Sequence, residues 1–150
     1  MARQEGAPVG VMVGSAIAPE QIGPLARLGE ELGYSELWIP EDYFFTGGVS
    51  GVGVALGATS RIKVGFGIVS AVVRHPAVLA MELATLSRAY PGRVLPGVGL
   101  GVPFWLSQMG LNPKSSLGAV RECITSVRAL LDGQELTSSE GLFTFDKVQL

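Results

Sequence analysis

Short runs of apolar residues alternate along the chain with segments whose apolar residues recur at helical spacing. Residues 62–69 form a near-continuous apolar run, which is typical of a strand buried on both faces of a parallel sheet. From Pro76 to Tyr90 the apolar residues recur at intervals of three and four, which predicts a helix. The whole pattern predicts strands at 9–13, 36–40, 62–69 and 93–100, helices at 19–32, 49–58, 76–90 and 117–131, and a hairpin-like segment at 136–150.

Regular alternation of strands and helices predicts an α/β fold with a parallel sheet and helices outside it. Two architectures have this pattern: an open, doubly wound sheet and a (β/α)8 TIM barrel. A dinucleotide-binding open sheet needs a Gly-x-Gly-x-x-Gly loop after its first strand, and none occurs there; the run from Gly97 to Gly101 comes close, but Val102 breaks the spacing. The pattern favours a TIM-barrel-type fold, with about the first four βα units in a single domain over 1–150.

Composition and charge exclude several kinds of partner and site. The 11 Lys and Arg residues against 13 Asp and Glu residues give a net charge of −2 without a basic run, so nucleic acid is not an expected partner. The longest uncharged stretches, 43–60 and 94–113, are broken by glycines or prolines, so we expect no membrane-spanning helix. One Cys and one His exclude a disulfide framework and a metal site of several His or Cys ligands. Residues 1–6 contain Glu5 and no apolar run, so we expect no secretion signal and a soluble, cytoplasmic protein.

Candidate chemistry gathers where the predicted strands end, which is where TIM barrels hold their active sites. Each feature also has a plain structural explanation. The carboxylates can be solvated loop residues, the histidine can be a helix-terminal residue packed under the barrel rim, and the glycines can form a tight turn. Their occurrence at successive strand ends favours a site. The residues are Glu41, Asp42 and Tyr43 after the second strand, Ser70 at the end of the third, Arg74 and His75 before its helix, and Gly97, Gly99 and Gly101 in the fourth.

Several of these motifs together resemble the N-terminal half of the luciferase-like monooxygenase superfamily. The resemblance covers nearly the whole chain, and the motifs occur in the order expected for that family. Leu32-Gly33-Tyr34, with Trp38 and Asp42, fits its first two βα units. The other motifs are the run from Thr59 to Ile68 (TSRIKVGFGI), Arg74-His75-Pro76-Ala77, Gly92-Arg93-Val94, and Gly97-Val98-Gly99-Leu100-Gly101.

This resemblance implies a TIM barrel that binds FMN or the deazaflavin coenzyme F-420 at the carboxyl ends of its strands. The implied activity is that of an oxidoreductase, which performs hydride transfer or monooxygenation on a small organic substrate. The strand-three and Arg-His-Pro context favours F-420, with FMN as the alternative. It implies no metal and a mainly structural role for His75, and it assigns no catalytic residue. The implied cofactor-binding residues are Asp42 near the ring edge, the stretch Gly67, Ile68, Val69 and Ser70 with a non-prolyl cis peptide, and Gly99 and Gly101 beneath the cofactor tail or substrate.

The chain departs from the sugar-phosphate dehydrogenase branch of that family at two positions. Tyr43 replaces a histidine, and Val102 and Pro103 occupy the place of a glutamate. A reductase that only transfers hydride needs fewer protein acids, so the reductase-like branch is favoured. Pro96 inside the fourth strand removes a backbone donor, which predicts either an unpaired edge or an irregular strand there.

Two other functions stay open at this point. The first is a non-catalytic half-barrel that associates with another chain, as a homo-oligomer or with a complementing half-barrel, because four units leave strands one and four as open edges. The second is an open-sheet nucleotide binder, for which the sequence contains no motif. We expect a small-molecule substrate for the oxidoreductase.

Overall fold

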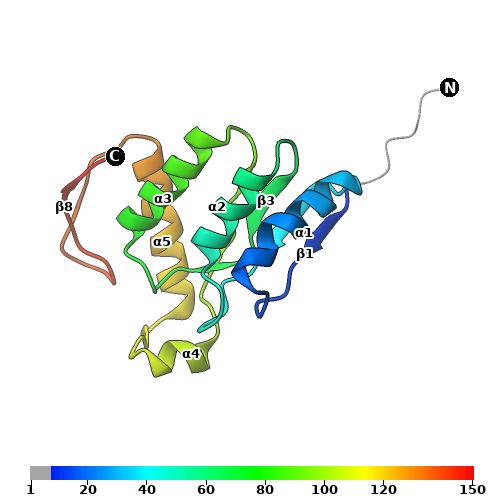
Figure 1. Ribbon diagram of the computed structural model, residues 1–150. Helices are drawn as coiled ribbons and strands as arrows, with labels where there is room; N and C mark the ends of the chain where they lie inside the picture. The colour runs from blue at the N-terminus through cyan, green and yellow to red at the C-terminus, as the bar shows by residue number, and fades with distance from the viewer. Residues whose placement is uncertain (1–7) are drawn as a thin grey trace.

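The computed structural model describes residues 8–150 (Figure 1). The prediction of no secretion signal falls on residues 1–6 and lies outside the described residues. No helix within 8–150 has the length and apolar character that crossing a membrane requires. The elements are β1 (Gly10–Met12), α1 (Pro19–Glu31), β2 (Glu36–Ile39), α2 (Gly48–Ala58), β3 (Lys63–Phe66), β4 (Val69–Ser70), α3 (Pro76–Ala89), β5 (Val94–Leu95), β6 (Val98–Gly99), α4 (Pro103–Gln108), α5 (Ser116–Leu131), β7 (Leu136–Ser138) and β8 (Phe145–Val148).

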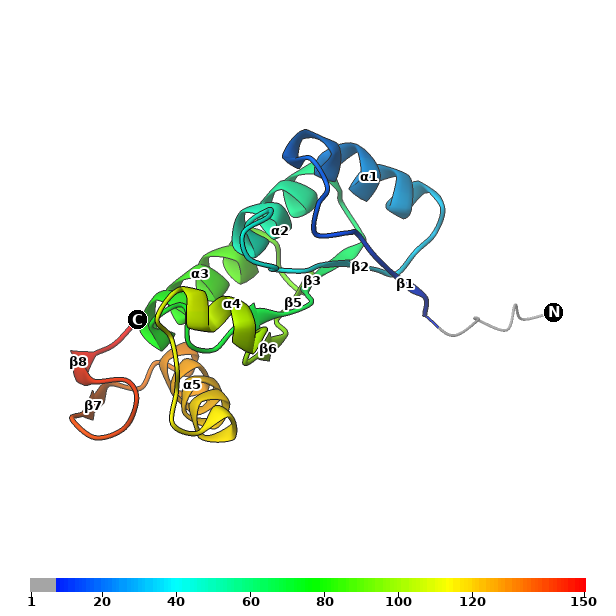
Figure 2. The same cartoon turned by 90° about the horizontal axis from the view of Figure 1, so that it is seen from below.

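The strands form a parallel sheet in the order β1-β2-β3-β5, which β4 and β6 continue as a second parallel pair. Helices α1, α2 and α3 lie along one side of these strands (Figure 2). This arrangement confirms the predicted α/β fold with parallel strands. The β7–β8 pair is antiparallel and lies within the predicted segment 136–150.

Two predicted strands are interrupted, and one helix was not predicted. The segment 62–69 breaks between β3 and β4 at Gly67 and Ile68, so the prediction of one continuous strand is wrong. The segment 93–100 breaks between β5 and β6 at Pro96 and Gly97, because Pro96 has no N–H for the ladder. The ladder resumes where the Val69 N–H donates to the Gly97 carbonyl. The unpredicted helix is α4, which follows β6.

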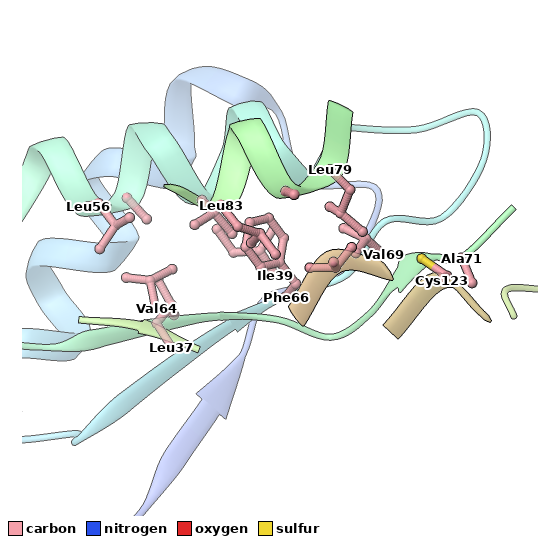
Figure 3. Close-up of a cluster of buried hydrophobic side chains, with 14 of the residues drawn as sticks. Leu37, Ile39, Leu56, Val64, Phe66, Val69, Ala71, Leu79, Leu83 and Cys123 are labelled. Carbon is pink, nitrogen blue, oxygen red and sulfur yellow. The ribbon is translucent and has the colours of Figure 1, made fainter. Parts of the chain in front are cut away.

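The hydrophobic core lies between the sheet and helices α2 and α3 (Figure 3). Alternate residues of β2 and β3 point to this side, which is the period of two that strand geometry dictates. Leu79 and Leu83 of α3 and Leu56 of α2 close the core from above. The strand residues that enter it are Leu37, Ile39, Val64 and Phe66, all of them buried.

The opposite face of the sheet carries a tryptophan and glycines. Trp38 of β2 pairs in register with Gly65 of β3. A Cβ on Gly65 would overlap the Trp38 ring, so only glycine allows the ring to lie across the sheet. Met12 of β1 is exposed on the neighbouring strand. The described residues therefore cover only part of this face of the sheet.

Helix α1 buries a narrower face than the spacing of its leucines predicts. Ile22 is buried, but Leu25, Leu28 and Leu32 are exposed, Leu32 to 68%. The residues of α1 that pack inward are small, including Ala26, because α1 lies close against α2. The leucine stripe instead lines a hollow of about 510 Å³ beside β1.

The Glu30 carboxylate ties the end of α1 to the segment that enters β3. It accepts hydrogen bonds from the backbone N–H groups of Ser60, Arg61 and Ile62 at 3.1, 2.6 and 2.8 Å, and from the Ser60 hydroxyl at 3.2 Å. Burial by itself would raise the pKa of Glu30, but these donors prevail and lower it from 4.5 to about 2. The ionised carboxylate is thus the form that holds this junction.

Arg93 performs the corresponding role at the end of α2. Its guanidinium donates to the carbonyls of Thr59 and Ile62 at 3.0 and 3.1 Å, and to the Thr59 hydroxyl at 2.6 Å. The Thr59 carbonyl at the carboxyl end of α2 lacks a helical partner, so the bond from Arg93 satisfies a group that would otherwise need water.

Replacement of Glu30 by Gln should destabilise the protein by about 1–3 kcal/mol at pH 7, because charged hydrogen bonds to three backbone donors are weakened. The lowered pKa means that this stability is fully present above pH 4.5 and is lost as the pH falls toward 2. The difference in unfolding free energy between wild type and Glu30→Gln should therefore shrink between pH 5 and pH 2.5, as measured by urea denaturation. The exposed neighbour Glu31 supplies the control, and an equal effect of Glu31→Gln would contradict the assignment.

Candidate active site

The carboxyl ends of the strands meet at one end of the molecule, the lower end in Figure 1, where α4 also lies. The segments at this end are residues 40–47 after β2, residues 71–75 after β4 and residues 100–102 after β6. The peptide that joins Gly67 to Ile68, between β3 and β4, lies here as well and is called the Gly67–Ile68 step. Parallel strands bring these segments together although they are distant in sequence. We therefore consider this end as the candidate active site.

The Gly67–Ile68 step presents backbone and one apolar side chain at this end. The Gly67–Ile68 peptide is cis, as predicted for the stretch 67–70. Gly67 is half-buried and Ile68 is 37% exposed, whereas Val69 and Ser70 are buried behind them. A ligand can therefore contact Gly67 and Ile68 directly, while Val69 and Ser70 fix the step from the rear.

Gly99 lies directly beneath Ile68. A Cβ built on Gly99 would stand 3.0 Å from the Ile68 Cδ1 atom, so a side chain there would displace Ile68. The structure thus brings Gly99 to the predicted step.

Ser70 joins β4 to the end of β6. Its hydroxyl donates to the Leu100 carbonyl and accepts a hydrogen bond from the Val72 N–H at 3.3 Å. Gly101 follows with a φ of 93°, in the left-handed region that favours glycine, and a Cβ there would stand 3.3 Å from Ser70. The Ser70 hydroxyl is therefore bonded within the protein, and Gly101 belongs to the same small cluster.

Asp42 and Tyr43 form the tight turn after β2. Asp42 is half-buried, and its backbone carbonyl accepts a hydrogen bond from the Phe45 N–H at 3.0 Å. The Tyr43 ring meets Trp105 of α4 edge to face at 6.3 Å. The Tyr43 hydroxyl is buried without a hydrogen-bond partner in the described chain, and burial raises the pKa of this phenol. Tyr43 is therefore protonated at neutral pH.

Glu41 is an anchor of the loop rather than a solvated loop carboxylate. Its side chain is only 4% exposed, and Arg74 donates to its two oxygens at 2.6 Å each. This pairing raises the pKa of Arg74, so its guanidinium stays protonated. Gly48 begins α2 beside this pair, and a Cβ there would come within 2.8 Å of the Glu41 Cβ. The ion pair fixes the segment after β2 to the segment after β4.

His75 occupies the structural position expected of it. Its Nδ1 atom accepts a hydrogen bond from the Ala77 N–H at 3.2 Å, which caps α3, and its Nε2 atom lies 3.0 Å from the Thr144 carbonyl. Phe143 and Phe145 of the hairpin segment pack on the ring. Both ring nitrogens are thus engaged, and His75 links α3 to the β7–β8 segment.

Two features of this end were not predicted from the sequence. The ion pair joins Glu41 to Arg74 across 33 residues, and no local pattern signals it. Trp105 enters through α4, for which Pro103 at the first helical turn was an available signal. Across residues 8–150, no cluster of three or more His, Cys, Asp or Glu side chains is arranged to hold a metal ion.

Four parallel strand–helix units with a site at the carboxyl ends of the strands define half of a (β/α)8 barrel. The sequence profile described as luciferase-like monooxygenase matches residues 5–150, and the chain belongs to this family.

Individual relatives and a solved structure also match this chain along part of their own length. The chain is 27% identical over 125 residues to a 5,10-methylenetetrahydromethanopterin reductase of Methanolobus tindarius, covering 83% of this chain and 38% of that protein. It is 28% identical over 160 residues to an F-420-dependent glucose-6-phosphate dehydrogenase of Nakamurella multipartita, covering 95% and 47%. The structure of the coenzyme F-420-dependent tetrahydromethanopterin reductase of Methanopyrus kandleri aligns with a TM-score of 0.83 at 25% identity, covering 95% and 45%. The chain thus spans less than half the length of these relatives.

Replacement of Arg74 by Met should destabilise the protein by about 2–5 kcal/mol, because the Glu41 carboxylate would stay buried without its counter-charge. The double variant Arg74→Met/Glu41→Gln removes that charge and should recover part of the loss. Urea denaturation of the wild type, both single variants and the double variant measures this coupling. Strictly additive effects would contradict the buried pair.

Proposed function

We propose that this chain supplies the ring-binding part of an oxidoreductase that uses coenzyme F-420, with FMN as the alternative, on a small organic substrate. The observation that carries the proposal is the exposed Gly67–Ile68 step at the carboxyl ends of the strands. The names of the relatives support the choice, because two of the three proteins compared above are described as F-420-dependent.

The residues at this end suit a flat ring. Gly67 offers backbone without a side chain, and Ile68 offers an exposed apolar surface next to it. Gly99 and Gly101 carry no side chain at the end of the neighbouring strand, so a planar group can approach the backbone closely at these two positions. Asp42 follows β2, and the family resemblance implies a carboxylate near the ring edge at this position. Buried Val69 and Ser70 hold the step in place.

When bound, the cofactor supplies the hydride or oxygen chemistry, and the protein supplies position and electrostatics. Tyr43 stays protonated, so it is a potential hydrogen-bond donor and not a base. Glu41 and Arg74 hold the loop that carries Asp42 and Tyr43. The residues of this chain at the site therefore position the cofactor and the loops. This favours hydride transfer of the reductase type, because that reaction needs fewer protein acids.

A second candidate function is association with another half-barrel, either a second copy or a complementing chain. The sheet order leaves β1 at an edge, with Met12 exposed. The exposed leucine stripe of α1 lies beside that edge, with Leu28 47% exposed. Exposed apolar surface next to an unpaired strand is a site at which chains associate.

Titration with oxidised F-420 should give saturable binding, with weaker binding of FMN, as measured by the absorbance and fluorescence of the cofactor. Gly99→Val should weaken this binding at least 10-fold, because the new side chain displaces Ile68 from the ring-binding surface.

The matched control is Gly53→Ala in the middle of α2, where a Cβ makes only an ordinary contact at 3.9 Å with Leu86. This variant should be as stable as wild type or more stable by up to about 1 kcal/mol, with unchanged cofactor binding. Absence of binding for both cofactors in folded wild-type protein would contradict the proposal, and equal binding by Gly99→Val would contradict the assigned surface.

If the leucine stripe mediates association, Leu28→Lys should weaken self-association or binding of a complementing half at least 10-fold, because a charge enters an apolar interface. Sedimentation velocity over a range of concentrations measures this. Met81→Lys changes an exposed residue on α3, away from the β1 edge, and should have no effect. A wild-type protein that is monomeric throughout would contradict this second function.

A further inference from the structure

Large apolar side chains are exposed in the segments that follow the strands. Phe44 is 67% exposed and Phe104 is 68% exposed, and Ile68 of the step is exposed as well. Phe44 follows β2 and Phe104 lies in α4, so both belong to segments at the carboxyl ends of the strands. Large apolar side chains that remain exposed together mark a binding surface.

Ring contacts connect Phe44 and helix α4 to the site. The Tyr43 ring lies 6.2 Å from the Phe44 ring and 6.3 Å from the Trp105 ring. The same Tyr43 ring stands 3.8 Å from a Cβ built on Gly101. Tyr43 thus joins Phe44 and α4 to the strand end that carries Gly101, and Phe44 is the outermost ring of this group.

The described segments at this end offer no free cation to an anionic substrate. Residues 40–47, 71–75 and 100–110 contain one Lys or Arg, which is Arg74. Arg74 is bound to both oxygens of Glu41 and lies 3.4 Å from Glu82, so its charge is already compensated. Asp42 adds a negative charge. A phosphate or carboxylate on the substrate would meet a carboxylate and no available cation in these segments.

We propose that the substrate is an uncharged, apolar organic molecule that packs on Phe44, and that Phe44 determines this preference. The inference rests on the proposed function, because it places the substrate beside the ring-binding surface of Gly67 and Ile68. Phe44 contributes apolar contact area and has no titratable group. Its removal should therefore lower affinity for neutral apolar ligands.

The neighbour Phe45 provides a matched control. It lies on the same loop and is 57% exposed, but it lines a separate hollow of about 650 Å³ with Ile17 and Val54, between α1 and α2. Phe44→Ala and Phe45→Ala remove the same group from adjacent positions that face different surfaces. A difference between them reports on the site and not on the loop in general.

The test uses two ligands with the same ring, methyl cyclohexyl ketone and cyclohexanecarboxylate, titrated calorimetrically into protein with bound cofactor. The ketone should bind wild type at least 10-fold more tightly than the carboxylate. Phe44→Ala should weaken ketone binding about 10-fold, Phe44→Leu should retain most of it, and Phe45→Ala should bind as wild type does. Thermal unfolding verifies that each variant is folded.

The inference is overturned if the carboxylate binds as tightly as the ketone, if neither binds, or if Phe44→Ala and Phe45→Ala behave alike. Cofactor binding is measured first in the same samples. Failure to bind either cofactor contradicts the proposed function, whereas normal cofactor binding without the expected ligand preference contradicts this inference alone.

Discussion

A parallel sheet is stable only when both of its faces are buried, and this chain provides helices for one face. On the covered face, Val64 and Phe66 pack against α2 and α3. On the other face, β3 has Gly65, and Trp38 fills the space that this glycine leaves. The sheet order also leaves β1 at an edge, beside the exposed stripe of α1. The uncovered face, the open edge and the exposed leucines are consequences of the same half-barrel geometry.

Charged side chains hold the junctions at which strands and helices change direction. Glu30 binds the backbone that enters β3, and Arg93 binds the backbone that leaves α2. At the opposite end of the strands, Glu41 and Arg74 join two loops. Each of these groups replaces water on backbone or side-chain atoms that the fold would otherwise leave unpaired. The Glu41–Arg74 pair consequently fixes the loops of the candidate site, and exposed residues such as Ile68 remain accessible to ligands.

Hydrophobic periodicity predicted the parallel topology and helices α1, α2, α3 and α5, because each of these helices carries its own local pattern. It did not predict α4 or the break within 62–69. Periodicity could not show that Leu28 and Leu32 are exposed, since burial depends on which neighbouring units are present. It also could not pair Glu41 with Arg74, which are distant in sequence. The break at Pro96 was predictable from the missing N–H. The Gly67–Ile68 step was predictable through family resemblance, because its sequence alone reads as a continuous strand.

The distribution of charge indicates which part of a cofactor these residues can hold. Both candidate cofactors combine a flat ring with phosphate. The loops of this chain at the site contribute backbone, Ile68 and a carboxylate, and their one cation is bound to Glu41. In TIM barrels, phosphate is frequently bound by the loops after strands seven and eight and by a helix amino terminus. The described residues at this end are therefore better suited to contact the ring of the proposed cofactor than its phosphate.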